Sequence, residues 1–177
     1  MFFTRKNDEN DTVKKDSSSI KMFLKDILVA LCIFSALYFT IELDIVVGES
    51  MKPTLNDGNV YVGLKVNRNT DYGRIVTVNI ESKGVKYTKR IIGKEGDTID
   101  LIDGIVYRNG VALDEPYVSS KTYATGDVVF PITVPDDCYF VLGDNRGMSM
   151  DSRFSEVGMI QEDDVDASYL FLLPWTR

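Results

Sequence analysis

The sequence of 177 residues contains no histidine. A Ser-His-Asp triad, a Cys-His protease site and a zinc site with histidine ligands are therefore excluded. Any general base that acts near neutral pH must be a carboxylate, a tyrosine, or a lysine whose pKa has been lowered. The absence of histidine therefore limits the possible general bases to these three kinds of side chain.

Cysteine is scarce, and positive charge is in the minority. Cys32 and Cys138 provide neither a disulfide framework nor a metal cluster, so we expect two free thiols. The serine and lysine chemistry considered below needs no metal or other cofactor. The formal net charge is −7, and no basic stripe offsets it. Because duplex binding depends on cations that neutralise phosphates, nucleic acid is not an expected partner. The apolar fraction of 44% is enough for one hydrophobic core.

One long apolar run lies near the N-terminus. Residues 27–41 are uninterrupted, and the run is long enough to span a bilayer if it begins at Met22, with Lys25 reaching back to the headgroups. We therefore predict a transmembrane helix over residues 22–41, preceded by a disordered tail at 1–21 that is polar and lacks an apolar pattern.

Charges on the two sides of this run predict its orientation. Lysines precede it, whereas Glu42 and Asp44 follow it, so the positive-inside rule places the N-terminus in the cytoplasm and residues 42–177 outside. We expect a single-pass protein of the cell membrane whose partner is the lipid bilayer. A cleaved secretory signal and a buried helix of a soluble protein are the alternatives, although no small-x-small cleavage site follows the run.

The remainder of the chain has the pattern of short strands separated by turns. Apolar alternation predicts strands at residues 59–66, 74–80, 85–92, 98–102, 105–108, 127–134, 139–142 and 167–173. Asp103-Gly104 and Asn109-Gly110 are strong signals for two-residue hairpin turns. We therefore predict a mainly β domain of antiparallel sheets after one N-terminal transmembrane helix. The apolar C-terminal segment, 171–173 with Trp175, is expected to fill the core.

Two segments combine residues that are suited to nucleophilic chemistry. In GESMKPTL, residues 48–55, Pro53 disfavours helical geometry before it, so a bend can present the Ser50 hydroxyl together with its backbone N–H. In VKYTKRIIG, residues 85–93, strand alternation puts Lys89 among apolar side chains, where desolvation lowers the pKa of an amine. An ordinary Ser/Pro turn and an exposed lysine are the simpler interpretations of the two segments.

A third segment concentrates polar groups after an apolar strand. GDNRGMSMDSR, residues 143–153, carries two aspartates and two arginines, and Asp151 can pair with either Arg153 or Arg146 to hold the loop rigid. Ser149 can direct its hydroxyl at a neutral amine. Taken alone, this segment is also compatible with a structural loop, because Asp and Asn favour turns.

Together, in this order and after a single span, the three segments resemble the short bacterial form of the type I signal peptidases, which are Ser-Lys proteases. The similarity covers nearly everything after residue 20. It implies that residues 42–177 form an extracytoplasmic protease domain. Its partners would be secretory preproteins that carry signal peptides, and we expect it to act as a monomer.

The resemblance also implies roles for individual residues. Ser50 would attack the scissile carbonyl and supply one oxyanion donor through its N–H, while neutral Lys89 would accept the Ser50 proton. Ser149 would orient the Lys89 amine. Support would come from Asp151, Arg153 and Asp144, and the shallow substrate pockets would be lined by Val46 and Thr88.

Gly48 departs from the family pattern, because some members have a serine there that assists the oxyanion. A second oxyanion donor therefore has to come from elsewhere. Two rival functions remain. One is a self-cleaving repressor protease, although residues 1–26 are too short and polar for a DNA-binding head. The other is a non-enzymatic membrane chaperone or assembly factor derived from this fold.

The anchor can be tested by extraction. Alkaline sodium carbonate removes peripheral proteins from membranes but leaves a transmembrane helix in the bilayer, so the chain should stay in the pellet. Immunoblotting of the pellet and supernatant measures the partition, with a known peripheral protein as the control. Release of the chain into the supernatant would contradict the anchor.

Overall fold

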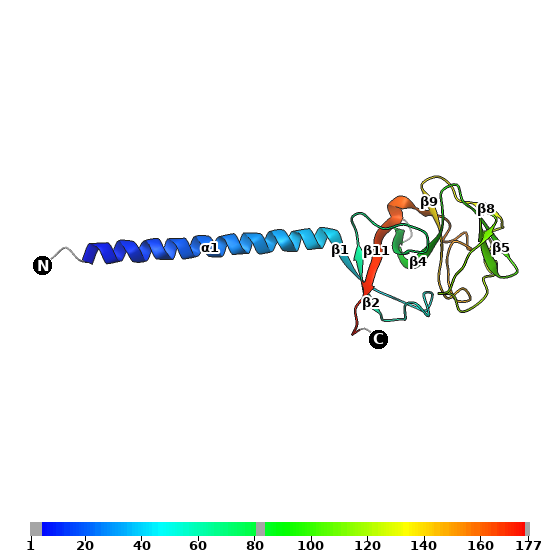
Figure 1. The fold of residues 1–177 in the computed structure, drawn as a ribbon, viewed down its shortest axis with the longest axis horizontal. Helices are drawn as coiled ribbons and strands as arrows, with labels where there is room; N and C mark the ends of the chain where they lie inside the picture. The colour runs from blue at the N-terminus through cyan, green and yellow to red at the C-terminus, as the bar shows by residue number, and fades with distance from the viewer. Residues whose placement is uncertain (1–4, 81–83, 176–177) are drawn as a thin grey trace. The chain divides into compact units, whose positions relative to one another are not determined.

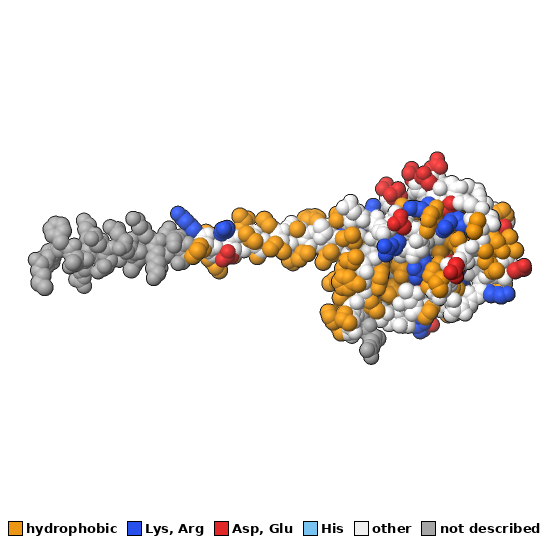
Figure 2. Space-filling model, in the orientation of Figure 1, with side chains coloured by type: hydrophobic (Ala, Val, Ile, Leu, Met, Phe, Trp, Pro, Cys, Tyr) orange, Lys and Arg blue, Asp and Glu red, His pale blue; other side chains and the backbone are white. Residues whose placement is uncertain are grey.

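The computed structural model describes residues 5–80 and 84–175 and divides into a helical unit up to Thr40 and a β unit from Ile41 onward. In the first unit, α1 covers Arg5–Thr40. Its segment Ile20–Thr40 has a mean hydropathy of 2.0, and none of its residues is buried within the structure. Figure 2 shows the apolar side chains along this segment. The helix is thus long and apolar enough to cross a membrane.

The predicted disorder of residues 1–21 is not what the structure has over residues 5–21, where α1 is continuous. Each residue added to an existing helix gains one hydrogen bond without a new nucleation cost, so the apolar segment can extend into its polar flank. Residues 1–4 lie outside the described part of the chain.

The β unit contains two antiparallel sheets. The larger has the order β1-β2-β11-β3-β4-β9-β10, with bounds Ile41–Ile45, Val60–Leu64, Val165–Leu172, Ile75–Ile80, Val85–Lys94, Cys138–Leu142 and Ile160–Gln161. The smaller has the order β7-β6-β5-β8, with bounds Val111–Ala112, Ile105–Arg108, Thr98–Ile102 and Ile132–Thr133. The short 3₁₀ helix η2, Glu162–Asp164, leads into β11. The predicted mainly β, antiparallel fold is confirmed (Figure 1).

The two predicted hairpin turns are present. Asp103-Gly104 joins β5 to β6, and Asn109-Gly110 joins β6 to β7, with positive φ angles at all four residues. This is the backbone of the two-residue turns whose twist matches the twist of the strands. The short second sheet is therefore encoded largely by local sequence.

The predicted strand at residues 127–134 is wrong over most of its length, because only β8, Ile132–Thr133, forms. Pro131 has no N–H to donate to a neighbouring strand, and Asp127 instead bonds the backbone N–H of Ser155 at 2.8 Å. Three further strands, β1, β7 and β10, were not predicted. In β1 the polar residue Asp44 is buried and Ile45 is exposed, which is the reverse of the usual alternation.

Strand β9 is buried on both faces and separates two hydrophobic clusters. Tyr139 and Val141 join a cluster with β3 and β11. Phe140 and Leu142 join a second cluster, which reaches the smaller sheet through Ile99. The free thiol of Cys138 lies in that second cluster, and the thiol of Cys32 on α1 is also free. The core thus continues from one sheet into the other.

A third cluster supports the segment that follows β1. It contains Met51, Leu55 and Tyr61, which are almost completely buried. The C-terminal apolar segment contributes less than expected, because only Leu172 packs against this cluster. Trp175 is 75% exposed and Phe171 is 50% exposed, so the prediction that this segment fills the core is wrong for both.

The junction between the sheets can be tested with two isoleucines of β5. Ile99 is fully buried, whereas Ile102 is 46% exposed. Truncation of a buried isoleucine to alanine loses transfer free energy and leaves a cavity, at a cost of about 2–5 kcal/mol. Ile99→Ala should therefore lower the free energy of unfolding by that amount in urea titrations of the detergent-solubilised chain. Ile102→Ala should cost under about 1 kcal/mol, and equal losses in the two variants would contradict this core.

Candidate active site

The segment after β1 turns sharply and presents Ser50. Gly48 adopts φ +87°, which favours glycine, and its N–H bonds the carboxylate of Asp57 at 2.7 Å. Met51 and Leu55 anchor the following turn in the core. Ser50 itself is partly exposed, so its hydroxyl is held on a rigid turn and remains accessible.

Lys89 extends from β4 to the Ser50 hydroxyl. Its Nζ lies 2.9 Å from Ser50 Oγ and 3.2 Å from the carbonyl oxygen of Thr88. Lys89 is only 3% exposed, and it lies on the same strand face as Tyr87 and Ile91, as the alternation predicted. The serine and the lysine are 39 residues apart in the chain, and the fold brings them into contact.

Burial controls the protonation of this lysine. Desolvation lowers the pKa of Lys89 to about 8, and the negative charges of Asp151 and Asp144 oppose this effect. The cause is that a low-dielectric environment disfavours the charged amine. Near pH 8, about half of the molecules would carry a neutral amine beside Ser50.

Asp151 pairs with Arg153, which decides between the two partners that the sequence left open. The Arg153 Nε lies 2.8 Å from Asp151 Oδ1, and Nη2 lies 2.9 Å from Oδ2. Both side chains are fully buried, and the Gly143 N–H also donates to Asp151 at 3.1 Å. Such a bidentate pair is stronger and more directional than a single contact. Together with the bond from the Gly143 N–H, this pair links the two ends of the loop formed by residues 143–153.

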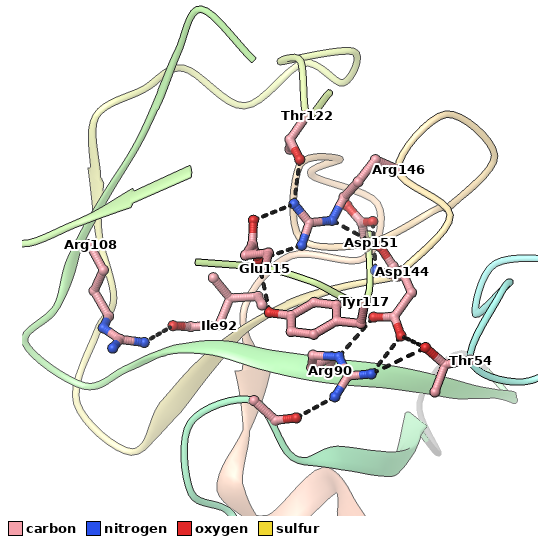
Figure 3. Close-up of polar contacts among 12 residues, drawn as sticks. Thr54, Arg90, Ile92, Arg108, Glu115, Tyr117, Thr122, Asp144, Arg146 and Asp151 are labelled. Atoms are coloured by element: carbon pink, nitrogen blue, oxygen red, sulfur yellow. Dashed lines mark hydrogen bonds and ion pairs between the residues drawn. The ribbon is translucent and has the colours of Figure 1, made fainter. Parts of the chain in front are cut away.

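Asp144 has a partner that the sequence analysis missed. Arg90, the neighbour of Lys89 on β4, donates to Asp144 through Nε at 2.8 Å and Nη2 at 2.5 Å. The hydroxyl of Thr54, from the Ser50 segment, donates to the same carboxylate (Figure 3). Asp144 therefore joins all three of the segments that were predicted to carry the chemistry.

Arg146 also has a partner outside the predicted segments. It forms a bidentate pair with Glu115 at 2.6 and 3.0 Å and bonds the Thr122 hydroxyl and the Gly143 carbonyl (Figure 3). Glu115 lies in the connection after β7, 31 residues from Arg146. Nothing in the local pattern around Glu115 indicated this contact.

The expected contact between Ser149 and the Lys89 amine is not formed. Ser149 is buried at 5% exposure, and its hydroxyl has no hydrogen-bond partner among the described residues. It packs against Gly143, where an added Cβ would lie 2.2 Å from Ser149 Oγ and 2.5 Å from the Ser50 carbonyl oxygen. The Lys89 amine bonds Ser50 and the Thr88 carbonyl instead, so the predicted orienting role is not supported by the geometry.

A cleft of about 360 Å³ contains both reacting groups. Its lining includes residues 44–48 and 86–89 together with Met148 and Met150. Val46 and Thr88 line it, as the sequence analysis expected of substrate-pocket residues. Among the described residues, no group of three or more metal-ligating side chains occurs that could hold a metal ion.

Two strand edges border this cleft. Residues 85–90 of β4 pair with β3, but pairing with β9 begins only at Arg90. In the described sheet, β1 lies at one end and pairs with β2 alone. The backbones on both sides of the cleft therefore have unpaired edges, which can accept an extended peptide.

Comparison with known proteins identifies similar sequences over nearly the whole chain. Residues 20–175 match the family described as signal peptidase, peptidase S26. The chain is 41% identical to signal peptidase I P of Bacillus subtilis subsp. natto over 88% of its length and 89% of the relative's. It is 37% identical to signal peptidase I T of Bacillus subtilis (strain 168), with 91% and 89% covered.

A solved structure is similar to part of the chain. The crystal structure of a signal peptidase I from Enterococcus faecalis is 31% identical, with a TM-score of 0.49 over 57% of this chain and 96% of that one.

The burial of Lys89 predicts a pH-dependent effect on stability. Below pH 8 both the folded and the unfolded chain hold the proton, so the desolvation cost, about 3 kcal/mol, is fully present. From pH 8 to about 10.5 the folded state has lost the proton while the unfolded state still binds it, so stability rises with pH. Lys89→Met should thus be the more stable protein near pH 6–7 and lose this advantage toward pH 10.

Thermal or urea unfolding of the detergent-solubilised chain between pH 6.5 and 10 measures this difference. Lys121→Met is the matched control, because Lys121 is exposed and its replacement should give a difference that does not change with pH. A Lys89→Met difference that is equally flat across this range would contradict the lowered pKa.

Proposed function

The chain belongs to the signal peptidase family, peptidase S26, whose serine peptidases cleave signal peptides, and we propose that Ser50 and Lys89 perform this reaction here. The observation that carries the proposal is the 2.9 Å contact between Lys89 Nζ and Ser50 Oγ, made by a lysine that is 3% exposed. Since the chain has no histidine, this lysine is the base closest to the hydroxyl that can be neutral near pH 8.

The first half of the reaction forms an acyl-enzyme. The neutral Lys89 amine accepts the proton of the Ser50 hydroxyl as Oγ attacks the scissile carbonyl carbon. The resulting oxyanion accepts a hydrogen bond from the Ser50 backbone N–H. As the C–N bond breaks, the Lys89 ammonium returns its proton to the departing amine, which leaves as the new N-terminus of the mature protein.

The second half regenerates the enzyme. The neutral Lys89 amine takes a proton from a water molecule, whose oxygen attacks the ester carbonyl on Ser50. Collapse of this second tetrahedral intermediate releases the signal peptide as a carboxylic acid, which loses its proton to solvent, and Ser50 recovers its proton from Lys89. The reaction needs no metal or other cofactor.

The ion pairs support this chemistry from outside the reacting atoms. Arg90 and Arg153 pair with Asp144 and Asp151, the two carboxylates whose negative charges favour the charged form of Lys89. The Arg90–Asp144 pair also holds β4 against the loop of residues 143–153. Removal of one partner would leave an uncompensated buried charge, which costs about 3–5 kcal/mol.

The substrate is proposed to bind as an added strand in the cleft between β1 and β4. The unpaired backbone edges there can form main-chain hydrogen bonds, which provide affinity with little dependence on sequence. Val46 and Thr88 would face alternate side chains of the peptide and leave room only for small ones before the cut.

The protein is proposed to act at the surface of the membrane as a monomer. The segment Ile20–Thr40 would span the bilayer, with the N-terminus in the cytoplasm and the β unit outside. The excess of lysine before this segment and the acidic residues after it support that orientation. Secretory preproteins would reach the cleft with their signal peptides in the same membrane.

Substitution of the two reacting residues tests the proposal. Ser50→Ala removes the nucleophile, and Lys89→Ala removes the base, so each should lower kcat for a signal-peptide substrate by about 10⁴-fold or more. Mass spectrometry of the products from a peptide with an Ala-x-Ala site measures the loss. Wild-type activity should rise through a midpoint near pH 8 as Lys89 deprotonates.

The controls are two exposed residues of the same types, replaced as Ser119→Ala and Lys121→Ala, which should retain wild-type activity. Near-wild-type turnover in either Ser50→Ala or Lys89→Ala would remove that residue from the mechanism. An activity that is independent of pH between 6 and 9 would contradict the lysine as base.

A further inference from the structure

Asn145 contacts the nucleophile segment at two successive carbonyl groups. Its side-chain Nδ2 donates to the Glu49 carbonyl at 3.1 Å, and its backbone N–H donates to the Ser50 carbonyl at 2.9 Å. The residue belongs to the loop that follows β9, about 95 positions farther along the chain. It therefore fixes the backbone on both sides of the Ser50 α-carbon from another part of the fold.

The first of these contacts controls the direction of one N–H group. The Glu49 carbonyl and the Ser50 N–H belong to the same planar peptide, which is trans, because the cis peptides of the described chain are at Pro53 and Pro131. In a trans peptide the C=O and N–H bonds point in opposite directions. Holding the carbonyl toward Asn145 thus directs the Ser50 N–H away from it.

The Ser50 N–H is also free to bind an oxyanion. No acceptor for it occurs among the described residues. The only other hydrogen bond described to the Glu49 carbonyl is a long one from the Lys52 N–H within the same turn, at 3.2 Å. The Glu49–Ser50 peptide can rotate about the backbone bonds of these two residues, so the Asn145 amide adds a second restraint to the one from Lys52 within the turn.

Asn145 is itself well placed to act as that restraint, because both of its neighbours are fixed. Asp144 is held by Arg90, and Arg146 is held by Glu115, as Figure 3 shows for these four residues. Asp144 and Arg146 are 0% and 1% exposed. The backbone at Asn145 therefore has little freedom to follow a movement of the Ser50 turn.

We infer that Asn145 is a positioning residue for the oxyanion site: its side-chain amide orients the Glu49–Ser50 peptide so that the Ser50 N–H points at the developing oxyanion. The inference rests on the proposed function of Ser50. Gly48 has no side chain that could donate a second hydrogen bond to the oxyanion. The direction of the Ser50 N–H therefore matters more for stabilising the oxyanion. Asn145 contacts neither the substrate nor Lys89 in this account.

The test is the replacement Asn145→Ala in the full chain in detergent micelles, with the Ala-x-Ala peptide as substrate. A misdirected N–H weakens stabilisation of the transition state but not of the bound substrate. We expect kcat to fall about tenfold, less than the roughly 10²–10³-fold loss for complete removal of an oxyanion donor. KM should stay within about twofold, and the midpoint of the pH profile should not move, because Lys89 is unchanged.

A second readout separates positioning from a general structural role. A peptide aldehyde of the same sequence forms a hemiacetal with a serine, and its oxygen then occupies the oxyanion position. Its inhibition constant should rise by the same factor as kcat/KM falls, whereas the affinity for an uncleavable peptide with a reduced bond should not change. Asn69→Ala is the matched control, because the Asn69 side chain accepts a backbone hydrogen bond from Asp71 and lies outside the cleft.

If Asn145→Ala does not fold, Asn145→Ser, which is neutral and too short to reach the Glu49 carbonyl, takes its place. Unchanged kcat in a folded variant, a loss confined to KM, or a shifted pH midpoint would each overturn the inference. A wild-type chain that does not cleave the peptide would instead count against the proposed function.

Discussion

The arrangement of side chains around the active site depends on the buried amine of Lys89. Lys89 is enclosed by protein, and the loss of water lowers its pKa to about 8, which in the proposed mechanism makes it available as a base beside Ser50. That burial destabilises the folded state by about 3 kcal/mol at neutral pH. The surrounding structure offsets this cost with three hydrophobic clusters, with the Arg90–Asp144 pair that joins β4 to the loop of residues 143–153, and with the Asp151–Arg153 pair inside that loop.

The charges near the amine act on it in opposing ways. Asp144 and Asp151 favour the ammonium form, yet each carboxylate is already bound by an arginine, Arg90 or Arg153. An arginine stays charged throughout the working pH range, so the pairs keep their geometry while Lys89 gains and loses its proton. A chain without histidine can thus combine a rigid polar scaffold with one group that titrates near pH 8.

The features that could be predicted from the sequence are those set by interactions between residues close together in the chain. The hairpin turns at residues 103–104 and 109–110 and the face of β4 that carries Lys89 lie within short stretches of chain. For Asp151 the sequence left two arginines open, and the fold pairs it with Arg153. The bonds of Asp144 to Arg90 and of Arg146 to Glu115 could not be predicted, because they join residues 54 and 31 positions apart and depend on the tertiary fold. Strand β1 was missed because its burial reverses the usual alternation, and nothing in the local pattern determined which group the Ser149 hydroxyl would face.

The titration of the Lys89 amine itself tests the central claim most directly. In the full chain labelled with ¹⁵N at lysine side chains, the Lys89 signal can be assigned by its loss in Lys89→Met and then followed by NMR across pH 6–11. The account predicts a midpoint near 8, separated from the other lysines. A midpoint near the ordinary value of about 10.5 would show an amine that stays charged at working pH and cannot accept the Ser50 proton.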